Sequence, residues 1–417
     1  MKLLKTSFYT SLSTAVTFIS GFIVTKVVAV KIGPAGIAYV GQFQNTISIL
    51  TMLATGAITS ATIKYIANYR DQPEKKQRVL TTALTIVLLC SFTIAAFVIS
   101  ASGYLSRSVF KTGELWLVFV LYGVFITIIS VNSFYAAVFN GLKEIKKLTV
   151  INITGSLVGI IFTVIFAYAW GIKGVLIANN FTALILFIVN LWFLKKIKGI
   201  NWKPSFSKWD KRVAGMLFTF ALMNVVSGFV TPAAQLIVRN KIIENFSANE
   251  AGYWQAITRI SDYYLSFITT VLSVYYLPRL SELKEKHELK HEIIKGYKTL
   301  LPIVGVMAFL IWLCRTWIVH ILFTQNFLPM LPLFKYQLLG DFFKIGSWLL
   351  AFLMLSKALV RMYIITEIVF NATFVILSIF FISKNGIIGA TYAFCINYAL
   401  YWVVMWFLIK KRISNND

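Results

Sequence analysis

Residues 79–102 read VLTTALTIVLLCSFTIAAFVISAS, and none of these side chains carries a charge. At a rise of about 1.5 Å per residue, a helix over this stretch is long enough to cross the roughly 30 Å hydrocarbon core of a bilayer. An uncharged apolar stretch of this length is typical of a transmembrane helix. The stretch therefore predicts that the chain spans a membrane.

Similar stretches recur along the whole chain. The 417 residues are 58% hydrophobic and 13% charged, and the mean hydropathy is +0.77, a balance that a soluble domain does not need for its core. The pattern predicts an all-α membrane protein with twelve transmembrane helices, which we expect at about 7–30, 36–66, 79–102, 115–139, 149–170, 174–194, 213–238, 251–278, 299–322, 331–355, 360–383 and 387–409.

The basic residues indicate which side of the membrane each loop faces. Twenty-seven Lys and Arg residues lie at one set of span ends, whereas the opposite loops hold only Lys31, Arg107, Lys111, Lys173, Lys241 and Lys384. Cytoplasmic loops carry the excess of basic residues. Because both chain ends belong to the richer set, the pattern predicts that both termini are cytoplasmic.

The most hydrophilic internal loop, residues 195–212, follows the sixth predicted span. It predicts an N-terminal six-helix bundle at 1–198, a cytoplasmic linker at 199–212 and a C-terminal six-helix bundle at 213–417. A weak repeat agrees with two halves, since Ser20-Gly21-Phe22 recurs as Ser227-Gly228-Phe229. Each half would hold an even number of spans and begin on the same side, so the repeats would be parallel.

Two function classes are disfavoured. The formal net charge is +25, but the basic residues stand between long apolar runs and form no continuous stripe, so no nucleic-acid partner is expected.

The segment His287-Glu288-Leu289-Lys290-His291 matches the zinc-peptidase pattern H-E-x-x-H. It lies in a charged segment, residues 281–298, that is typical of a solvated helix without an apolar cleft. We expect no metal, no cofactor and no enzymatic activity.

Three acids lie at predicted membrane depth: Asp262, Asp341 and Glu367. Ionisable groups there are costly in lipid and usually face a bundle interior or a water-filled cavity. Asp262 follows Arg259 by three residues, and Asp341 precedes Lys344 by three, so in a helix each acid shares a face with a cation. These pairs either neutralise each other as structural ion pairs or line a hydrated cavity that binds charge.

Cations outnumber acids within or at the edges of the predicted spans, which hold Lys26, Lys64, Arg239, Arg259, Arg315, Lys335 and Lys344. Lys26 and Lys64 could extend to the membrane surface instead of facing a cavity. The span at 36–66 also carries ten hydroxyl and amide residues that suit an aqueous lining: Gln42, Gln44, Asn45, Thr46, Ser48, Thr51, Thr55, Thr59, Ser60 and Thr62. A cavity with more cations than acids favours an anionic ligand.

Several short stretches are also found in a known family. They are residues 26–30, Gly33-Pro34-Ala35-Gly36, Lys64-Tyr65-Ile66-Ala67, Trp254-Gln255, Ile260-Ser261-Asp262, Phe267-Ile268-Thr269, Leu277-Pro278, Gln337-Leu338-Leu339-Gly340-Asp341, Lys344 and residues 357–367. Through them, over essentially its whole length, the chain resembles the lipid III flippase and O-antigen translocase family of the multidrug/oligosaccharidyl-lipid/polysaccharide (MOP) exporter superfamily.

The resemblance implies two six-helix bundles in a MATE-like V shape around a cavity that opens alternately to each side. The implied activity is translocation of an undecaprenyl-diphosphate-linked oligosaccharide, an enterobacterial common antigen lipid III or O-antigen repeat unit, from the cytoplasmic to the periplasmic leaflet of a Gram-negative inner membrane. Expected partners are the lipid-linked glycan and membrane lipids, with a polysaccharide polymerase and a chain-length regulator as further candidates.

The intramembrane residues suit this chemistry, because a diphosphate and sugars cannot cross hydrocarbon unaided whereas a polyprenyl tail can stay in lipid. We expect the diphosphate to be bound by Lys26, Lys64, Arg259, Lys344 and Arg361. We expect sugar faces to stack on Tyr39, Tyr253 and Trp254. The expected groups that reset the cations or carry a coupling proton or sodium ion are Asp262, Asp341 and Glu367.

Three other functions remain open. A MATE-like cation-coupled multidrug antiporter shares the two-bundle design, but it usually needs acids to hold an organic cation. A polysaccharide polymerase or ligase generally needs a sizeable outer loop, and no predicted outer loop exceeds about a dozen residues. A structural membrane scaffold has no need for charged residues within its spans.

Overall fold

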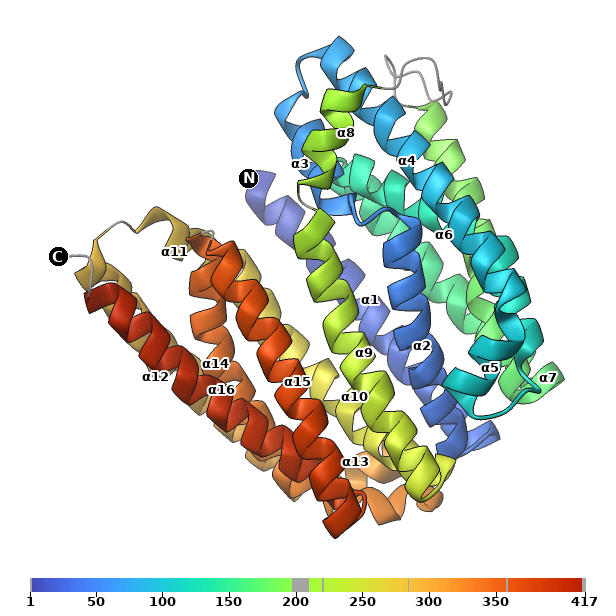
Figure 1. Cartoon of the computed structure of the whole chain (residues 1–417), viewed down its shortest axis with the longest axis vertical. Coiled ribbons are helices and arrows are strands. Elements are labelled where there is room, and N and C mark those ends of the chain that lie inside the picture. Colours follow the sequence, from blue (N-terminus) through green and yellow to red (C-terminus); the bar gives the residue numbers. More distant parts are fainter. Residues whose placement is uncertain (1, 197–209, 220, 284, 358, 415–417) are drawn as a thin grey trace. The chain divides into compact units, whose positions relative to one another are not determined.

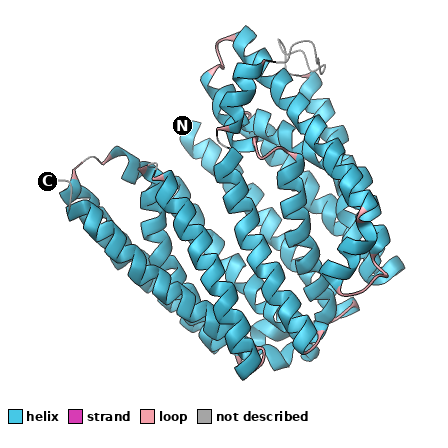
Figure 2. Ribbon diagram, viewed as in Figure 1, coloured by secondary structure: helices cyan, strands magenta, loops and turns pink. Residues whose placement is uncertain are grey.

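The computed structural model describes residues 2–196, 210–219, 221–283, 285–357 and 359–414. Within these ranges the regular structure is helical and no strand is present (Figure 2). The chain forms two compact units. The first unit comprises Met1–Ile32 and Tyr39–Ala233, and the second comprises Gly33–Ala38 and Ala234–Asp417.

Eight of the described helices are long and apolar enough to cross a membrane, and the bent pair α2 and α3 qualifies when it is taken as one span. Large apolar side chains lie exposed along these helices, among them Phe92 at 63%, Ile376 at 67% and Phe407 at 63%. Apolar surface of this extent is typical of helices that face lipid. The predicted all-α membrane class is therefore confirmed, whereas twelve helices in two bundles stays a prediction.

The first unit packs its helices around a core between α3, α4 and α6, which includes Ile66, Val79, Phe134 and Phe139. α1 packs along α7. The helices that contribute to this unit are α1 (Lys2–Lys31), α2 (Pro34–Ala54), α3 (Thr59–Asn68), α4 (Pro73–Ser100), α5 (Ser102–Phe110), α6 (Trp116–Gly141), α7 (Ile145–Lys195), α8 (Lys211–Phe218) and the first part of α9 (Ala221–Asn245).

Within α7, a tight turn divides the 51 residues into two arms. Gly171 adopts φ 57° and ψ −134°, a conformation that residues with a Cβ avoid. Gly174 lies so close to the end of the first arm that a Cβ there would be 2.0 Å from the carbonyl oxygen of Phe166. The turn fits the two separate spans that the sequence predicted at 149–170 and 174–194.

The same turn recurs in the second unit between α15 and α16. Gly386 adopts φ 65° and ψ −153°, and a Cβ on Gly389 would lie 2.1 Å from the carbonyl oxygen of Phe381. Both turns share the pattern F-x-x-x-x-G-I-x-G, and each position in the second lies 215 residues after its counterpart. The two units therefore contain one structural element in duplicate.

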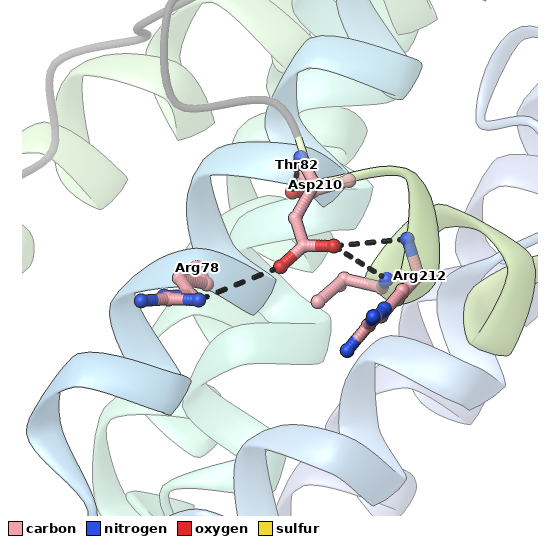
Figure 3. Close-up of polar contacts among 5 residues, drawn as sticks. Arg78, Thr82, Asp210 and Arg212 are labelled. Atoms are coloured by element: carbon pink, nitrogen blue, oxygen red, sulfur yellow. Dashed lines mark hydrogen bonds and ion pairs between the residues drawn. The ribbon is translucent and has the colours of Figure 1, made fainter.

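Helix α8 begins at the end of the predicted linker and packs on α3 and α4 of the first unit. Asp210 caps the helix, because its Oδ1 accepts hydrogen bonds from the backbone N–H groups of Arg212 at 2.9 Å and Val213 at 3.3 Å. Its Oδ2 lies 3.7 Å from Arg78 Nη1, and its own N–H donates to Thr82 on α4 (Figure 3). Most of the predicted linker, 199–212, lies outside the described residues.

In the second unit, α14 packs on both α12 and α16, and α16 also packs on α15. Figure 1 labels these helices. It contains the remainder of α9 followed by α10 (Ala248–Val271), a π-helical turn at Leu272–Tyr276, α11 (Leu277–Glu282), α12 (Lys286–Leu313), α13 (Arg315–Leu322), a 3₁₀ turn at Gln325–Met330, α14 (Leu333–Ser356), α15 (Val360–Asn385) and α16 (Ile388–Ser414). α10 also packs on α14. This contact brings Ser261 and Tyr264 of α10 next to Asp341 of α14.

The first residues of α2 dock on the start of α10 and so belong to the second unit. The backbone N–H of Ala35 donates to Asn249 Oδ1 at 3.1 Å. Gly252 allows this approach, because a Cβ there would lie 2.0 Å from the carbonyl oxygen of Pro34. The Gly33-Pro34-Ala35-Gly36 stretch is therefore a docking segment.

Candidate functional site

Asp341 on α14 is the most deeply buried acid of the candidate site, with 0% of its surface exposed. Its Oδ2 accepts hydrogen bonds from the hydroxyls of Ser261 at 2.6 Å and Tyr264 at 2.8 Å, which lie one turn apart on α10. Gln337, one turn earlier on α14, donates to Oδ1 at 3.4 Å. A buried carboxyl group is tolerated when donors surround it, and here they come from two helices.

Lys344 lies one turn beyond Asp341 but directs its ammonium group at aromatic rings. Its Nζ is 4.9 Å from the ring centroid of Trp348, 5.6 Å from that of Tyr398 and 5.7 Å from that of Phe394. Such contacts attract a cation through the electron-rich faces of the rings. Within the described residues, Asp341 and Lys344 form no direct ion pair, so the three-residue spacing did not produce the simple pairing that was one of the two predicted alternatives.

Longer-range electrostatic interactions join Lys344 to three acids, Asp262, Asp341 and Glu367. Asp262 is exposed, and the charges of Lys344 and Arg259 both act on it. Glu367 on α15 is half-buried and accepts a hydrogen bond from Asn371 at 3.2 Å. Five predicted site residues thus gather in the second unit, and we call them the charge cluster: Arg259, Asp262, Asp341, Lys344 and Glu367.

Acids outnumber cations in the charge cluster by three to two, the reverse of the balance counted over all predicted spans. The excess of cations over acids that was counted along all predicted spans is therefore absent from the charge cluster itself. Arg259 and Lys344 would attract an anion to the charge cluster only when protons or bound cations neutralise its three acids.

Arg239 on α9 is a further buried cation, outside the charge cluster, that was not among the residues predicted to bind the diphosphate. It is 0% exposed, donates to Gln255 Oε1 and lies with its guanidinium carbon 5.4 Å from the ring centroid of Trp254. The like charge of Arg259 acts on it. A single Arg inside an apolar span was the signal that could have singled it out.

The aromatic residues predicted to stack on sugars differ in accessibility. Trp254 is only 2% exposed and packs on Arg239, so its ring is closed to a sugar in this conformation. Tyr253 is half-buried and meets Phe327 edge-on at 6.1 Å. Tyr39 is half-buried in the first unit and meets Phe110 edge-on at 5.7 Å.

The remaining predicted cations are not members of the charge cluster. Lys26 is half-buried and Lys64 is exposed, and both belong to the first unit. Lys64 Nζ lies 5.7 Å from the ring centroid of Tyr65. Arg361 is exposed in the first turn of α15.

Metal-ligating residues do not converge within the described part of the chain, where no group of three or more His, Cys, Asp or Glu side chains could hold a metal ion. His287, Glu288 and His291 of the H-E-x-x-H segment are exposed near the start of α12. This segment is a solvated helix end, as its charge pattern predicted.

Known proteins resemble this chain in sequence and in structure. The family described as "Polysaccharide biosynthesis protein" matches residues 3–284. The lipid III flippases of Escherichia coli (strain K12) and Shigella flexneri are each 31% identical to it over 405 residues, which cover 96% of this chain and 97% of either flippase. A multidrug resistance MATE family transporter of the MOP superfamily, in its inward-facing conformation, matches with a TM-score of 0.82 and 16% identity, covering 95% of this chain and 94% of that one.

Proposed function

Because the chain belongs to the polysaccharide biosynthesis protein family, we propose that it is a flippase. Its substrate would be an undecaprenyl-diphosphate-linked oligosaccharide, a lipid III or O-antigen repeat unit, which it moves from the cytoplasmic to the periplasmic leaflet of the bacterial inner membrane. The observation that carries this proposal is the similarity to lipid III flippases along nearly the entire chain.

The physical task of such a flippase is to carry a charged, hydrated head group past hydrocarbon. Burying an unpaired diphosphate in lipid is prohibitively costly. The polyprenyl tail needs no such help, so the protein has to provide a polar route for the head group alone. Arg259 and Lys344 in the charge cluster are the proposed diphosphate contacts of the second unit, with Arg361 nearer the helix end. Lys26 and Lys64 are those of the first unit.

The acids would make this binding reversible. With Asp262, Asp341 and Glu367 ionised, the charge cluster holds more acids than cations, and it repels a diphosphate. Protonation or sodium binding at these acids shifts the balance toward Arg259 and Lys344. Alternate neutralisation and release would load and unload the anion, which couples transport to an ion gradient.

The proposed architecture is twelve membrane helices in two six-helix bundles, which are parallel repeats of each other. The cavity that they form would open alternately to each side of the membrane, and both termini would be cytoplasmic. Several features support twelve spans. The turn at Gly171 gives α7 two membrane arms, and the bent pair α2 and α3 is a ninth candidate. α9 and α10, of 25 and 24 residues, are long enough to span but carry more polar side chains. The duplicated F-x-x-x-x-G-I-x-G turn supports two related halves.

A MATE-like multidrug antiporter is the second candidate, favoured by the structural similarity to a MATE family transporter. The two functions differ in the ligand. An antiporter for organic cations would bind a cationic dye through Asp262 and Glu367, whereas the proposed flippase would bind a lipid diphosphate through Arg259 and Lys344.

The decisive experiment is complementation of a strain that lacks its lipid III flippase or O-antigen translocase, followed by identification of the exported sugar repeat. We expect the chain to restore surface glycan. Purified protein in nanodiscs should bind undecaprenyl diphosphate and not ethidium. A chain that reaches the membrane, restores no glycan in either strain and binds ethidium would favour the antiporter. Co-purification from the complemented strain would test the proposed polymerase and chain-length regulator as partners.

A further inference from the structure

An open cavity of about 500 Å³ lies in the first unit, at the break between α2 and α3. α2, α3, α6 and α9 all contribute to its wall. Among the described residues, six hydroxyl side chains and two amide side chains line it, together with three apolar residues and no charged side chain. We call it the hydroxyl pocket. Its volume falls within the range of small-molecule sites, and its polar groups converge from several helices.

The polar wall follows from the spacing of residues along α2. Gln44, Ser48, Thr51 and Thr55 follow one another at intervals of four, three and four, which places them on one face of a helix. The helix then breaks, and α3 continues at an angle of 48°. Ala57 within the break adopts φ 53°, a conformation that a residue with a Cβ rarely takes.

Asn224 on α9 holds this break in place. Its Nδ2 donates to the carbonyl oxygen of Ala57 at 2.8 Å, and its Oδ1 accepts from the hydroxyl of Ser60 at 3.1 Å. One side chain therefore satisfies a backbone carbonyl that the broken helix leaves open and also fixes the first turn of α3. A wall held in this way is preorganised, which lowers the entropic cost of binding a ligand.

The hydroxyls of the pocket retain hydrogen-bonding capacity. Thr55 donates to the carbonyl oxygen of Met52 and Ser133 to that of Ile129, so their oxygen lone pairs remain available to accept. In the described part of the chain, the hydroxyls of Ser48 and Thr59 have no hydrogen-bond partner. A ligand can therefore find both donors and acceptors here.

We infer that the hydroxyl pocket binds an uncharged sugar residue of the lipid-linked oligosaccharide, an inference that rests on the proposed flippase function. Sugar hydroxyl and acetamido groups both donate and accept, as do the hydroxyls and amides of the wall. Ile47 and Met52 supply apolar surface for the C–H face of a sugar ring. The described lining residues carry no charge, which favours an uncharged ligand over a diphosphate or an organic cation. Diphosphate and sugar are thus recognised by different residues.

The test measures how much a sugar adds to binding. Full-length protein in nanodiscs is titrated with farnesyl diphosphate linked to N-acetylglucosamine and with farnesyl methyl diphosphate, a lipid of the same charge without the sugar. We expect the parent protein to prefer the sugar-bearing lipid. The Ser48→Ala/Thr59→Val double variant should lose about fivefold of this preference for each hydrogen bond removed, with unchanged affinity for the methyl lipid.

Controls separate this inference from folding and from the proposed function. Thr93→Val removes an exposed hydroxyl on α4, outside the pocket, and should keep the full preference. The single variant Thr59→Val serves if the double variant does not fold. A preference that survives loss of both hydroxyls, or a parent protein without any preference, would overturn the assignment. A parent protein that binds neither lipid would instead refute the flippase function on which it rests.

Discussion

The hydroxyl of Tyr264 on α10 donates a 2.8 Å hydrogen bond to Oδ2 of Asp341 on α14, although the two residues are 77 positions apart. Ser261 donates to the same oxygen from one turn earlier on α10. The carboxyl group of Asp341 thereby joins two helices at predicted membrane depth. Asp341 contributes both an acceptor for these hydrogen bonds and a negative charge. Substitutions can remove one of these two contributions and keep the other.

Asp341→Asn tests the charge. The amide keeps the size of the side chain and an acceptor for Tyr264 but cannot ionise, so export in the complemented strain should fall about tenfold or more, which corresponds to ~1.4 kcal/mol. Membrane abundance, measured by immunoblot, should stay near that of the parent. Tyr264→Phe is the control, since it removes one donor and keeps the charge. It should cost about 1 kcal/mol of stability and preserve export. Normal export by Asp341→Asn would exclude a role for this charge.

Lys344→Ala tests the proposed diphosphate contact. Removal of the ammonium group should abolish export and weaken undecaprenyl diphosphate binding about tenfold. Lys384→Ala is a matched control, because Lys384 also lies over an aromatic ring, 4.3 Å from the centroid of Phe380, but is exposed at the end of α15. It should bind and export as the parent does. Equal effects of the two substitutions would mean that the ring contact, and not the position of Lys344, is what matters.

Gly252→Ala tests the docking of the Gly33-Pro34-Ala35-Gly36 segment on α10. The added Cβ would meet the Pro34 carbonyl oxygen at 2.0 Å, so the backbone must shift, at a cost of about 3 kcal/mol. We expect a lower melting temperature and reduced membrane abundance. Gly305→Ala should be harmless, because its Cβ would meet only Phe342 at an ordinary 3.8 Å. Equal thermal stability of both variants would contradict the close approach.

Asp210→Ala tests the anchor of α8. Loss of the N-cap should cost about 1 kcal/mol, measured as a shift in thermal unfolding of the purified protein. Arg78→Ala should have little effect, because the Arg78 side chain is 63% exposed and water screens its ion pair. A larger loss from Arg78→Ala than from Asp210→Ala would mean that the ion pair, not the cap, holds the helix.

Hydropathy predicted the membrane helices well where a span is a straight apolar helix. The predicted span at 331–355 corresponds to α14, Leu333–Ser356, and that at 360–383 to α15, Val360–Asn385. It failed to predict the break within 36–66, because the break depends on a backbone conformation and on Asn224 from a distant helix. Hydropathy alone placed the start of the next span at residue 299, whereas α12 begins at Lys286. The charge pattern of residues 281–298 did predict a solvated helix there, because a helix can continue into charged sequence that water solvates.

Spacing along the sequence predicted which residues belong to the charge cluster, but it did not predict which groups they contact. The three-residue interval placed Asp341 and Lys344 on one helix face, yet Asp341 accepts hydrogen bonds from Ser261 and Tyr264 while Lys344 lies among aromatic rings. The partners come from another helix, and a single sequence carries no record of which helices pack together. Of the ten hydroxyl and amide residues predicted to line a cavity in the span at 36–66, six line the hydroxyl pocket. Gln42, Thr46 and Thr62 are instead buried among the helices.

Two helices belong to both compact units. Packing passes from one unit to the other within α2, between Ala38 and Tyr39, and within α9, between Ala233 and Ala234. Pro232 lies just before the second crossing, and it deprives the helix of one backbone hydrogen bond there. In the proposed alternating-access cycle, α2 and α9 would have to bend or twist at these crossings whenever the two units move. Substitutions that stiffen either helix there are expected to slow transport without changing the affinity for the ligand.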